Sequence, residues 1–285
     1  MPDGACAESA ARYRRVPRGL IVTVDETAPA AGTDRSRCPS VPADRLVGCL
    51  GAGEVWVQGM PVVSLWDGRV LGVEMLARWR TPDGRVLLPA QFLPRVDEAG
   101  LWEDLDHAVL TQGLQAGAAL PAAVGIGVNL SAASLYRPDL ADWLRGEMDT
   151  AGILPNRLHL ELTETSVLRV DARVTAAMQE VADAGVRWWV DDFGTGYSSI
   201  SHLRDLPITG MKLDRSFTAG ITDRKTRNAR LALGLAGLAA GLGLDTIAEG
   251  VETRQQAQLL AEQGWQMGQG LLFGAAGDVT TLDLA

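Results

Sequence analysis

Cysteine and histidine are both scarce in this chain, with three residues of each among 285. The cysteines lie near the N-terminus without a CxxC spacing, at Cys6, Cys38 and Cys49. An odd, unclustered set of this kind predicts reduced thiols in a cytoplasmic protein rather than a disulfide framework. The histidines are scattered and form no zinc-ligand motif such as HExxH.

An excess of basic residues is also missing, because 35 Asp and Glu residues outnumber 26 Lys and Arg residues and give a net charge of −9. The chain therefore has no basic footprint for duplex nucleic acid or an anionic membrane. Its longest uncharged apolar run, residues 231–244, is shorter than the roughly 20 residues that cross a bilayer. No apolar secretory segment is visible at the N-terminus. We expect a cytoplasmic protein in which residues 231–244 form a buried core helix.

Two parts of the chain differ in pattern. Residues 1–50 mix proline, alanine, serine, glycine and charged residues without apolar periodicity, which is typical of a linker or a disordered extension. Residues 51–285 are expected to form the functional domain. Apolar, β-branched-rich runs predict strands within residues 60–65, 69–80, 123–131, 157–164, 186–194, 210–217, 244–251 and 265–274. Helical patterns lie between several of them, as in residues 101–117, 171–185, 227–241 and 252–264.

The alternation of strand and helix predicts an α/β fold built from parallel β/α units. A chain of 285 residues is long enough for one (β/α)8 barrel of roughly 250 residues. The first two strands are joined by Trp66-Asp67-Gly68, a hairpin signal, so one strand is expected to be antiparallel. Trp188 and Trp189 alternate across one strand, so we expect one to pack inside the barrel and the other under a helix.

Polar side chains lie at or just past the ends of successive apolar runs: Asn129, Glu161, Asp191, Lys212, Glu249 and Gln269. Consecutive members are roughly 20 to 37 positions apart, which is one β/α unit each. The strand ends of a β/α barrel converge on one face, where active sites are built. Glu74 fits the same ring, although it lies inside its run.

The adjacent aspartates Asp191 and Asp192 allow two interpretations. Such a pair alone is more often a turn or a helix N-cap. Beside Glu74, Glu161 and Glu249, however, these carboxylates would raise each other's pKa and could not all stay ionised. Divalent cations relieve this repulsion, and an all-oxygen ligand set favours Mg²⁺ or Mn²⁺ over zinc. Two such ions, bridged by a carboxylate, catalyse in-line displacement at phosphate.

Three further signals also have alternatives. Lys212 is costly to bury in an apolar strand without partners, which favours a role in orienting or deprotonating water or in offsetting phosphate charge. Glu249 and Glu252 also fit a surface salt-bridge pair that opens a helix. The segment Gly194-Thr195-Gly196 is only part of a dinucleotide-binding motif, and we interpret it as a flexible loop that gates the site or faces a second subunit.

Seven segments resemble a known family in order and spacing: "GVEMLARWR", "VNLS", "ELTE", "DDFGTGYSS", "MKLDRSF", "AEGVET" and "QGLLFG". Between about Val55 and Gly274 the chain is similar to the EAL-type cyclic-di-GMP phosphodiesterases. This resemblance implies a modified TIM (β/α)8 barrel with one antiparallel strand. It also implies hydrolysis of cyclic di-GMP to the linear dinucleotide pGpG with two Mg²⁺ or Mn²⁺ ions. Members often dimerise, so a homodimer is expected as one possibility.

The resemblance assigns roles to individual residues. The implied metal ligands are Glu74, Asn129, Glu161, Asp191, Asp192 and Glu249, with Asp191 as the bridge. The implied catalytic residues are Lys212, which contacts the water, with Glu74 and Glu249. Substrate contacts fall on Arg78, Leu76 and Met60. Supporting positions are Glu164, Glu252, Gln269, Gly194, Thr195 and Gly196, of which Glu164 holds the loop after the aspartates.

Some positions depart from the family pattern. Met75 replaces the middle alanine of the name motif, and Met60 stands where a glutamine contacts the nucleotide, unless Gln58 substitutes for it. Ala275 stands where a basic residue usually borders the pocket. These changes leave a second hypothesis, a weak or inactive relative that binds cyclic di-GMP or a protein partner as a regulator.

Overall fold

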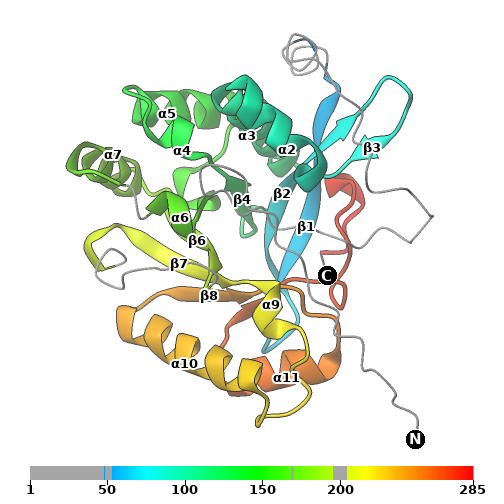
Figure 1. Ribbon diagram of the computed structural model, residues 1–285. Coiled ribbons are helices and arrows are strands. Elements are labelled where there is room, and N and C mark those ends of the chain that lie inside the picture. The colour runs from blue at the N-terminus through cyan, green and yellow to red at the C-terminus, as the bar shows by residue number, and fades with distance from the viewer. Residues whose placement is uncertain (1–47, 49–52, 168–169, 195–203, 285) are drawn as a thin grey trace, which may run out of the picture.

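The computed structural model describes residues 48, 53–167, 170–194 and 204–284. At its centre, eight strands close into a barrel with helices around it (Figure 1). The strands in chain order are β1 Val55–Ser64, β2 Val70–Arg80, β4 Gly125–Asn129, β5 Leu158–Thr163, β6 Arg187–Phe193, β7 Ile208–Leu213, β8 Asp245–Ala248 and β9 Met267–Gly268. The short β3 (Val86–Leu87) adds to the outer edge of β2. The predicted α/β barrel is confirmed.

Strand β1 is the antiparallel member of the barrel. It pairs antiparallel with β2 on one side and with β9 on the other, while β2, β4, β5, β6, β7, β8 and β9 pair in parallel. The turn between β1 and β2 contains Gly68 at φ 77°, a left-handed conformation that glycine adopts without steric cost. The predicted hairpin is therefore confirmed. It is longer than predicted, because β1 already begins at Val55 rather than near residue 60.

Helices cover the outside of the barrel (Figure 1). The longer ones are α2 Pro89–Ala99, α3 Trp102–Gly117, α5 Leu140–Ala151, α7 Ala172–Asp183, α10 Arg227–Leu242 and α11 Arg254–Glu262. Short turns of helix follow several strands: α4 Ala132–Leu135, α6 Glu164–Val167 and α9 Arg215–Thr218, with 3₁₀ turns η1 Pro155–Arg157 and η2 Val279–Thr281. Among the described helices, none has both the length and the apolar character that a bilayer crossing requires.

Helix α10 differs from the buried core helix expected for residues 231–244. Its buried stripe consists of the alanines Ala229, Ala232, Ala236 and Ala239, spaced three or four residues apart. Leu231 and Leu233 are 43% and 53% exposed. Small residues on the inner face let the helix lie close to the strands, whereas Leu231 and Leu233 project from the outer side. The helix is therefore buried on one side only, and the expectation was wrong.

Two adjacent tryptophans show how β6 separates the barrel interior from its helical cover. Trp189 points inward and packs with Val62 and Ile247. The Trp188 side chain points outward, and its indole N–H donates to the carbonyl of Met178 in α7 at 2.9 Å. The predicted division between the two rings is confirmed. It follows from the alternation of side chains along a strand.

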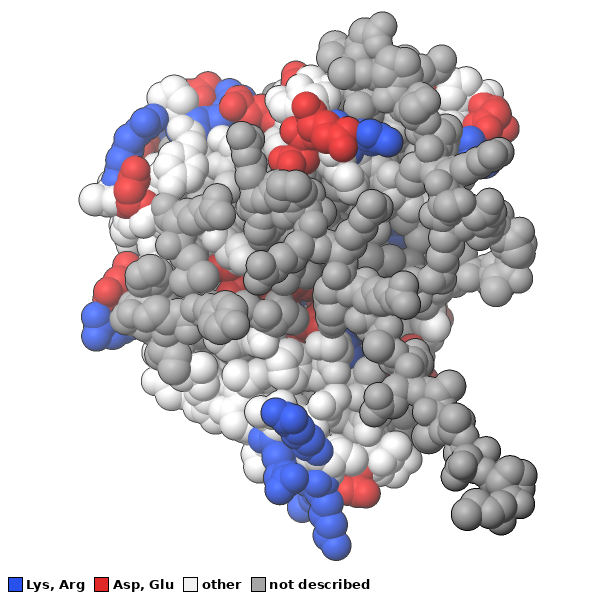
Figure 2. Space-filling model, viewed as in Figure 1, with Lys and Arg blue, Asp and Glu red and all other residues white. Residues whose placement is uncertain are grey.

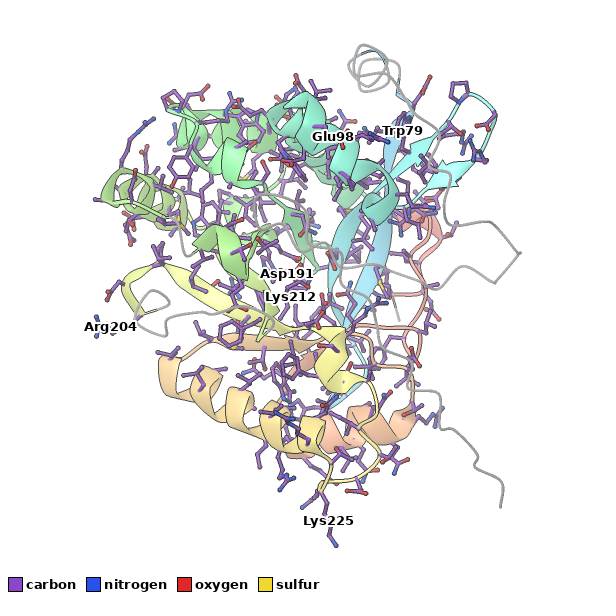
Figure 3. All side chains as sticks on the ribbon, in the orientation of Figure 1. Trp79, Glu98, Asp191, Arg204, Lys212 and Lys225 are labelled. Carbon is purple, nitrogen blue, oxygen red and sulfur yellow. The ribbon has the colours of Figure 1, made fainter. Side chains whose placement is uncertain are left out.

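Charge is unevenly distributed over the face seen in Figure 1. Figure 2 shows Lys and Arg side chains together at its lower end, where α10 begins and where Figure 3 labels Lys225. The exposed basic residues there are Arg224, Lys225, Arg227 and Arg230. Red carboxylate atoms are visible near the middle of the same face (Figure 2). The carboxyl ends of the parallel strands lie on this side of the barrel.

Candidate functional site

The barrel brings the predicted polar residues together at the carboxyl ends of its strands. The register places Glu74 of β2 beside Gly127 of β4, and Asn129 of β4 beside Glu161 of β5. Buried carboxylates, an amide and a lysine make up the cluster: Glu74, Glu161, Asp191, Asp192, Lys212, Glu249 and Gln269. Figure 3 shows Asp191 and Lys212 next to each other at the centre of the molecule. The ring predicted from strand spacing is therefore present.

Lys212 lies at the centre of this cluster and is completely buried. Its Nζ lies 2.7 Å from Glu161 Oε2 and 2.8 Å from Glu249 Oε1. Glu74 Oε2 follows at 3.1 Å and Asp191 Oδ1 at 3.4 Å. One ammonium group thus faces four carboxylates that lie in, or directly after, four different strands. An unpaired charge could not remain in such a place, whereas this arrangement gives the ammonium ion several acceptors.

Burial and mutual repulsion determine how these groups hold protons. Burial lowers the pKa of Lys212, but the surrounding carboxylates outweigh it and hold that pKa well above its ordinary value. Burial, together with neighbouring carboxylates, raises the pKa of both Glu161 and Glu249 well above the usual range. The pKa of Glu74 is lowered instead. Its burial raises this pKa, but the charge of Lys212 and the hydrogen bonds to Glu74 outweigh the effect of burial. The cluster therefore carries more acid groups than one cation can keep ionised, as expected for a cation site.

The backbone at Asp191 and Asp192 explains how two consecutive residues reach the same place. In a regular strand their side chains would point to opposite faces. Asp192 has φ 56°, the one positive φ of a non-glycine residue in the described part of the chain. The pairing of β6 with β7 shifts register across these two residues, between Val190 and Phe193. The bulge lets both carboxylates join Glu249, and backbone conformations of this kind are concentrated at functional sites.

Two amide side chains hold Glu74 in the cluster. Asn129 Nδ2 donates to Glu74 Oε1 at 2.9 Å, and Gln269 Nε2 donates to Glu74 Oε2 at 2.8 Å. Both amides therefore direct their N–H groups at the carboxylate, which leaves the Asn129 carbonyl oxygen able to bind a cation. Gln269 Oε1 is buried and has no hydrogen-bond partner within the described structure. The amides thus provide further oxygen acceptors beside the carboxylates.

The donor set fits divalent cations that prefer oxygen. Glu74, Glu161 and Asp191 can bring one oxygen each to within 4.8 Å of one another, and so can Asp191, Asp192 and Glu249. Asp191 belongs to both groups and is thus placed to bridge two ions. Oxygen-only ligands suit Mg²⁺ and Mn²⁺ better than zinc, which prefers nitrogen and sulfur. We therefore regard the two overlapping triads as a candidate two-metal centre.

One wall of the site is formed by the β1–β2 hairpin. Met60 lies opposite Glu74 and Gln58 lies opposite Leu76, so all four share the inner face. Arg78 is buried on the same face, and its Nε donates to Gln58 Oε1 at 2.8 Å. Gln58 therefore provides an amide on the wall where Met60 provides none. Of the three predicted substrate contacts, Leu76 and Arg78 follow Glu74 along β2, and Met60 lies beside Glu74 on β1.

The supporting residues differ in where they lie. Glu164, at the start of α6, accepts the backbone N–H of Gly194 at 3.1 Å, just past the aspartate pair. Gly194 has φ 98°, and a Cβ there would lie 2.8 Å from Phe217 Cζ, so glycine is required. Glu252 is exposed before α11, outside the buried cluster, and its role stays a prediction. Thr195 and Gly196 lie outside the described residues.

Three residues that the sequence did not single out also shape the site. A Cβ on Gly127 would lie 2.5 Å from Glu161 Oε1, so this glycine makes room for the carboxylate. Thr218 Oγ1 donates to the carbonyl of Glu249 at 2.5 Å. Asp106 accepts both the N–H and the hydroxyl of Ser131, two residues after Asn129. Of these three residues, only Gly127 had a signal in the sequence, because the glycines of "GIGVN" interrupt an otherwise β-branched strand.

Comparison with known proteins agrees with this geometry. The profile of the EAL domain family matches residues 49–276. The cyclic di-GMP phosphodiesterase NbdA of Pseudomonas aeruginosa is 35% identical over 217 residues, which is 75% of this chain and 28% of that protein. The probable cyclic di-GMP phosphodiesterase PdeG of Escherichia coli is 32% identical over 281 residues, 95% of this chain and 55% of that protein. The chain spans only about a quarter to a third of the first curated relatives that it matches.

Solved structures extend the match. A PaMucR phosphodiesterase in complex with c-di-GMP superposes with a TM-score of 0.76 at 31% identity, covering 82% of this chain and 96% of that one. The FimX EAL domain of Pseudomonas aeruginosa, bound to c-di-GMP, superposes with a TM-score of 0.78 at 24% identity, covering 86% of this chain and 100% of that one. This likeness supports the fold. The fold and the site therefore define a β/α barrel with a candidate two-cation centre at the carboxyl ends of its strands. The chain belongs to the EAL domain family.

Proposed function

We propose that this protein hydrolyses cyclic di-GMP to linear pGpG with two divalent cations, Mg²⁺ or Mn²⁺. The observation that carries the proposal is the pair of overlapping carboxylate triads that share Asp191, set around the buried Lys212. The named relatives act on or bind the same nucleotide. We further propose that residues 51–285 form the catalytic domain and residues 1–50 an extension to it.

The chain's own residues divide the work between them. Glu74, Asn129, Glu161 and Asp191 would hold the first ion, while Asp191, Asp192 and Glu249 would hold the second. When bound, the two ions supply an activated water nucleophile and stabilise the leaving oxygen. Lys212 is the group placed to orient that water and to offset charge on the phosphate.

The ammonium group of Lys212, held among these carboxylates, is placed to face a phosphate bound beside them. Without the ions, the surrounding carboxylates hold the pKa of Lys212 well above its ordinary value, so its ammonium group is a positive charge and a hydrogen-bond donor. Arg78, buried on the hairpin wall, is the second cation available to a phosphate oxygen.

The regulatory alternative rests on the departures at Met60 and Ala275. Gln58 offsets the first of these, because its amide lies on the same face and contacts Arg78. All predicted metal ligands are present in the buried cluster or at its edge. The observations therefore favour an enzyme over a binding protein without activity.

The proposal is tested by incubating the protein with cyclic di-GMP and Mg²⁺ or Mn²⁺ and separating the products by chromatography. Glu74→Ala, which removes a ligand held by Asn129 and Gln269, serves as the inactive partner. We expect pGpG from the wild type and none from the variant. Nucleotide binding without any pGpG at micromolar protein would show that the chain is a receptor and not an enzyme.

A further inference from the structure

The β1–β2 hairpin extends beyond the wall of the barrel. The last pairing of β2 with β4 joins Met75 to Val128, so the residues of β2 after Leu76 project past the carboxyl ends of the other strands. Beyond that point β2 pairs with β1 and, at Trp79 and Arg80, with β3. The projecting part of the hairpin therefore stands beside the mouth of the barrel (Figure 1).

The two faces of this projection have different surroundings. Trp79 lies on the outer face, where it is buried edge-to-face against Phe92 of α2 at 6.0 Å. Side chains alternate along a strand, so Arg78 and Arg80 share the inner face with Glu74. On β1, Trp56 lies opposite Arg78 and therefore also faces inward.

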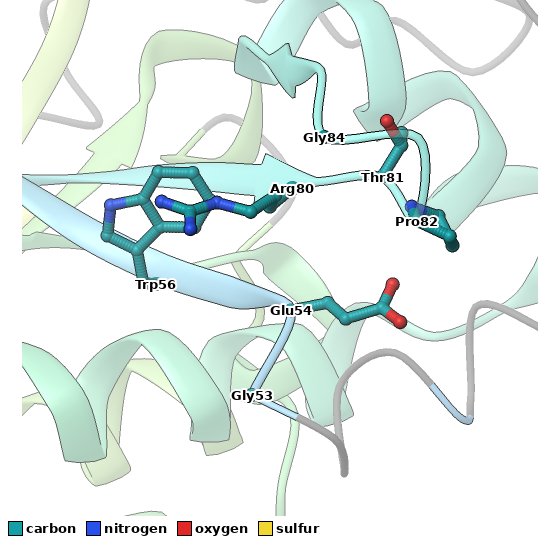
Figure 4. Close-up of a pocket in the computed structure, with 7 residues that line it drawn as sticks. All are labelled: Gly53, Glu54, Trp56, Arg80, Thr81, Pro82 and Gly84. Carbon is teal, nitrogen blue, oxygen red and sulfur yellow. The ribbon is translucent and has the colours of Figure 1, made fainter.

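An aromatic and a cationic side chain stack at the far end of the inner face. Arg80 Cζ lies 4.9 Å from the centroid of the Trp56 ring, and Figure 4 shows the guanidinium lying across it. Trp56 is half-buried and Arg80 is exposed. Both border a hollow of about 460 Å³ that is also lined by Glu54 and Pro82. A hollow of this size lies within the range of small-molecule sites.

The position of this pair fits a nucleotide that reaches outward from the carboxylates. Trp56 is level with Arg78, four residues along β2 from Glu74 and so about 13 Å away along the strand. In a nucleotide the base is separated from the phosphate by one ribose. A nucleotide with its phosphate at Arg78 therefore holds its base within reach of Trp56 and Arg80. Aromatic rings and guanidinium planes are the groups on which bases stack.

We propose that Trp56 and Arg80 form a stacking subsite for one guanine base of cyclic di-GMP, the base directed away from the carboxylate cluster. This inference rests on the proposed function for the identity of the nucleotide. It adds two binding residues that lie outside the metal ligands and outside the predicted substrate contacts Arg78, Leu76 and Met60. Stacking does not read base identity, so the subsite contributes affinity rather than specificity.

The test is a direct titration of the full chain with cyclic di-GMP by calorimetry, in the presence of EDTA so that no turnover occurs. Trp56→Leu and Arg80→Ala are the test variants, and Trp56→Phe keeps an aromatic ring. Trp66→Leu is the matched control, because Trp66 is 71% exposed at the opposite end of the same hairpin. We expect the Kd to rise about tenfold for Trp56→Leu and severalfold for Arg80→Ala. For Trp56→Phe and Trp66→Leu it should stay within about twofold of the wild-type value. Tenfold corresponds to about 1.4 kcal/mol, within the range for base stacking.

A second measurement separates this subsite from the catalytic centre. Bis(p-nitrophenyl) phosphate is a phosphodiester without a base, so its hydrolysis with Mn²⁺ should be equal in the wild type and in Trp56→Leu. An unchanged Kd in Trp56→Leu, or a parallel loss of activity on the baseless diester, would overturn the subsite. If the wild type binds cyclic di-GMP but hydrolyses neither diester, the proposed enzyme fails while the Kd comparison still decides the subsite. A wild type that does not bind the nucleotide refutes both.

Discussion

Lys212 Nζ lies 2.7 Å from Glu161 Oε2, and both side chains are buried. The two come from β7 and β5, 51 residues apart in the chain. Their contact shows that the lysine is held by the same carboxylates that are proposed to hold a metal ion. Lysine and metal thus compensate the same negative charge.

Replacing the lysine separates catalysis from binding. We expect Lys212→Met to lower turnover of cyclic di-GMP by at least about 100-fold, because a positioned donor that offsets charge in the transition state contributes roughly 10² to 10³ in rate. The Kd for the nucleotide should change little, since Arg78 and the hairpin wall remain. Steady-state kinetics and calorimetry measure the two quantities, with the exposed Lys225→Met as control. An equal loss of binding would show that Lys212 is a substrate contact instead.

Gly127 is expected to be intolerant of even one methyl group. In Gly127→Ala the new Cβ would lie 2.5 Å from Glu161 Oε1 and 3.4 Å from Glu74 Cα, so the glutamate must leave its place beside Lys212. We expect turnover to fall at least tenfold. Gly146→Ala is the matched control, because a Cβ at this position in α5 meets no atom within 4 Å. That change should stabilise the protein by about 0.5–1 kcal/mol without affecting turnover. Equal activity in both variants would contradict the packing argument.

We expect Asp106 to make the free energy of unfolding depend on pH. Burial raises the pKa of this carboxyl from 3.8 to about 6 in the folded protein. The folded state then keeps a proton that the unfolded state loses, so this group costs stability as the pH rises from about 4 to about 6. At 1.36 kcal/mol per unit, the loss is roughly 3 kcal/mol at neutral pH.

Asp106→Asn keeps an oxygen acceptor for Ser131 and removes the titration. Relative to wild type, its free energy of unfolding should therefore improve by roughly 2–3 kcal/mol between pH 4 and pH 7, as measured by urea denaturation. Asp104→Asn, on the exposed side of the same helix, provides the control. A difference between Asp106→Asn and wild type that is independent of pH would refute the assignment.

On the hairpin wall, we expect Gln58 to supply the amide that Met60 lacks. Gln58→Leu removes the acceptor of the Arg78 Nε–H, and losing a partner of a buried charged donor costs about 1–3 kcal/mol. We expect the KM for cyclic di-GMP to rise about tenfold with kcat nearly unchanged. Met60→Gln in the same background should restore part of the affinity, since Met60 shares the inner face. Val57→Ala, on the other face of β1, is the control. No recovery in the double variant would mean that Met60 lies outside the nucleotide site.

The barrel and its ring of polar strand ends were predictable because both depend on local periodicity. The spacing of Asn129, Glu161, Asp191, Lys212 and Glu249 counts β/α units, and each unit delivers its last residue to the same face. The hairpin followed from one turn signal. These features require no knowledge of which side chains touch.

The errors and omissions required knowledge of neighbours in space. Gly127 matters because Glu161 comes from the next strand, and Asp106 matters because Ser131 lies across from it. The run that contains Leu231 and Leu233 read as a core helix, but the face that packs inward is made of alanine. The bulge at Asp192 depends on the register with β7. Composition and spacing do not contain this information.

The most direct test of the account is product analysis for cyclic di-GMP with Mg²⁺ or Mn²⁺, run on the wild type beside Glu74→Ala. The account predicts that the wild type converts the nucleotide to pGpG, that chelation by EDTA stops the reaction, and that the variant is inactive at the same protein concentration. Wild-type protein that binds the nucleotide and leaves it intact with either metal would contradict it.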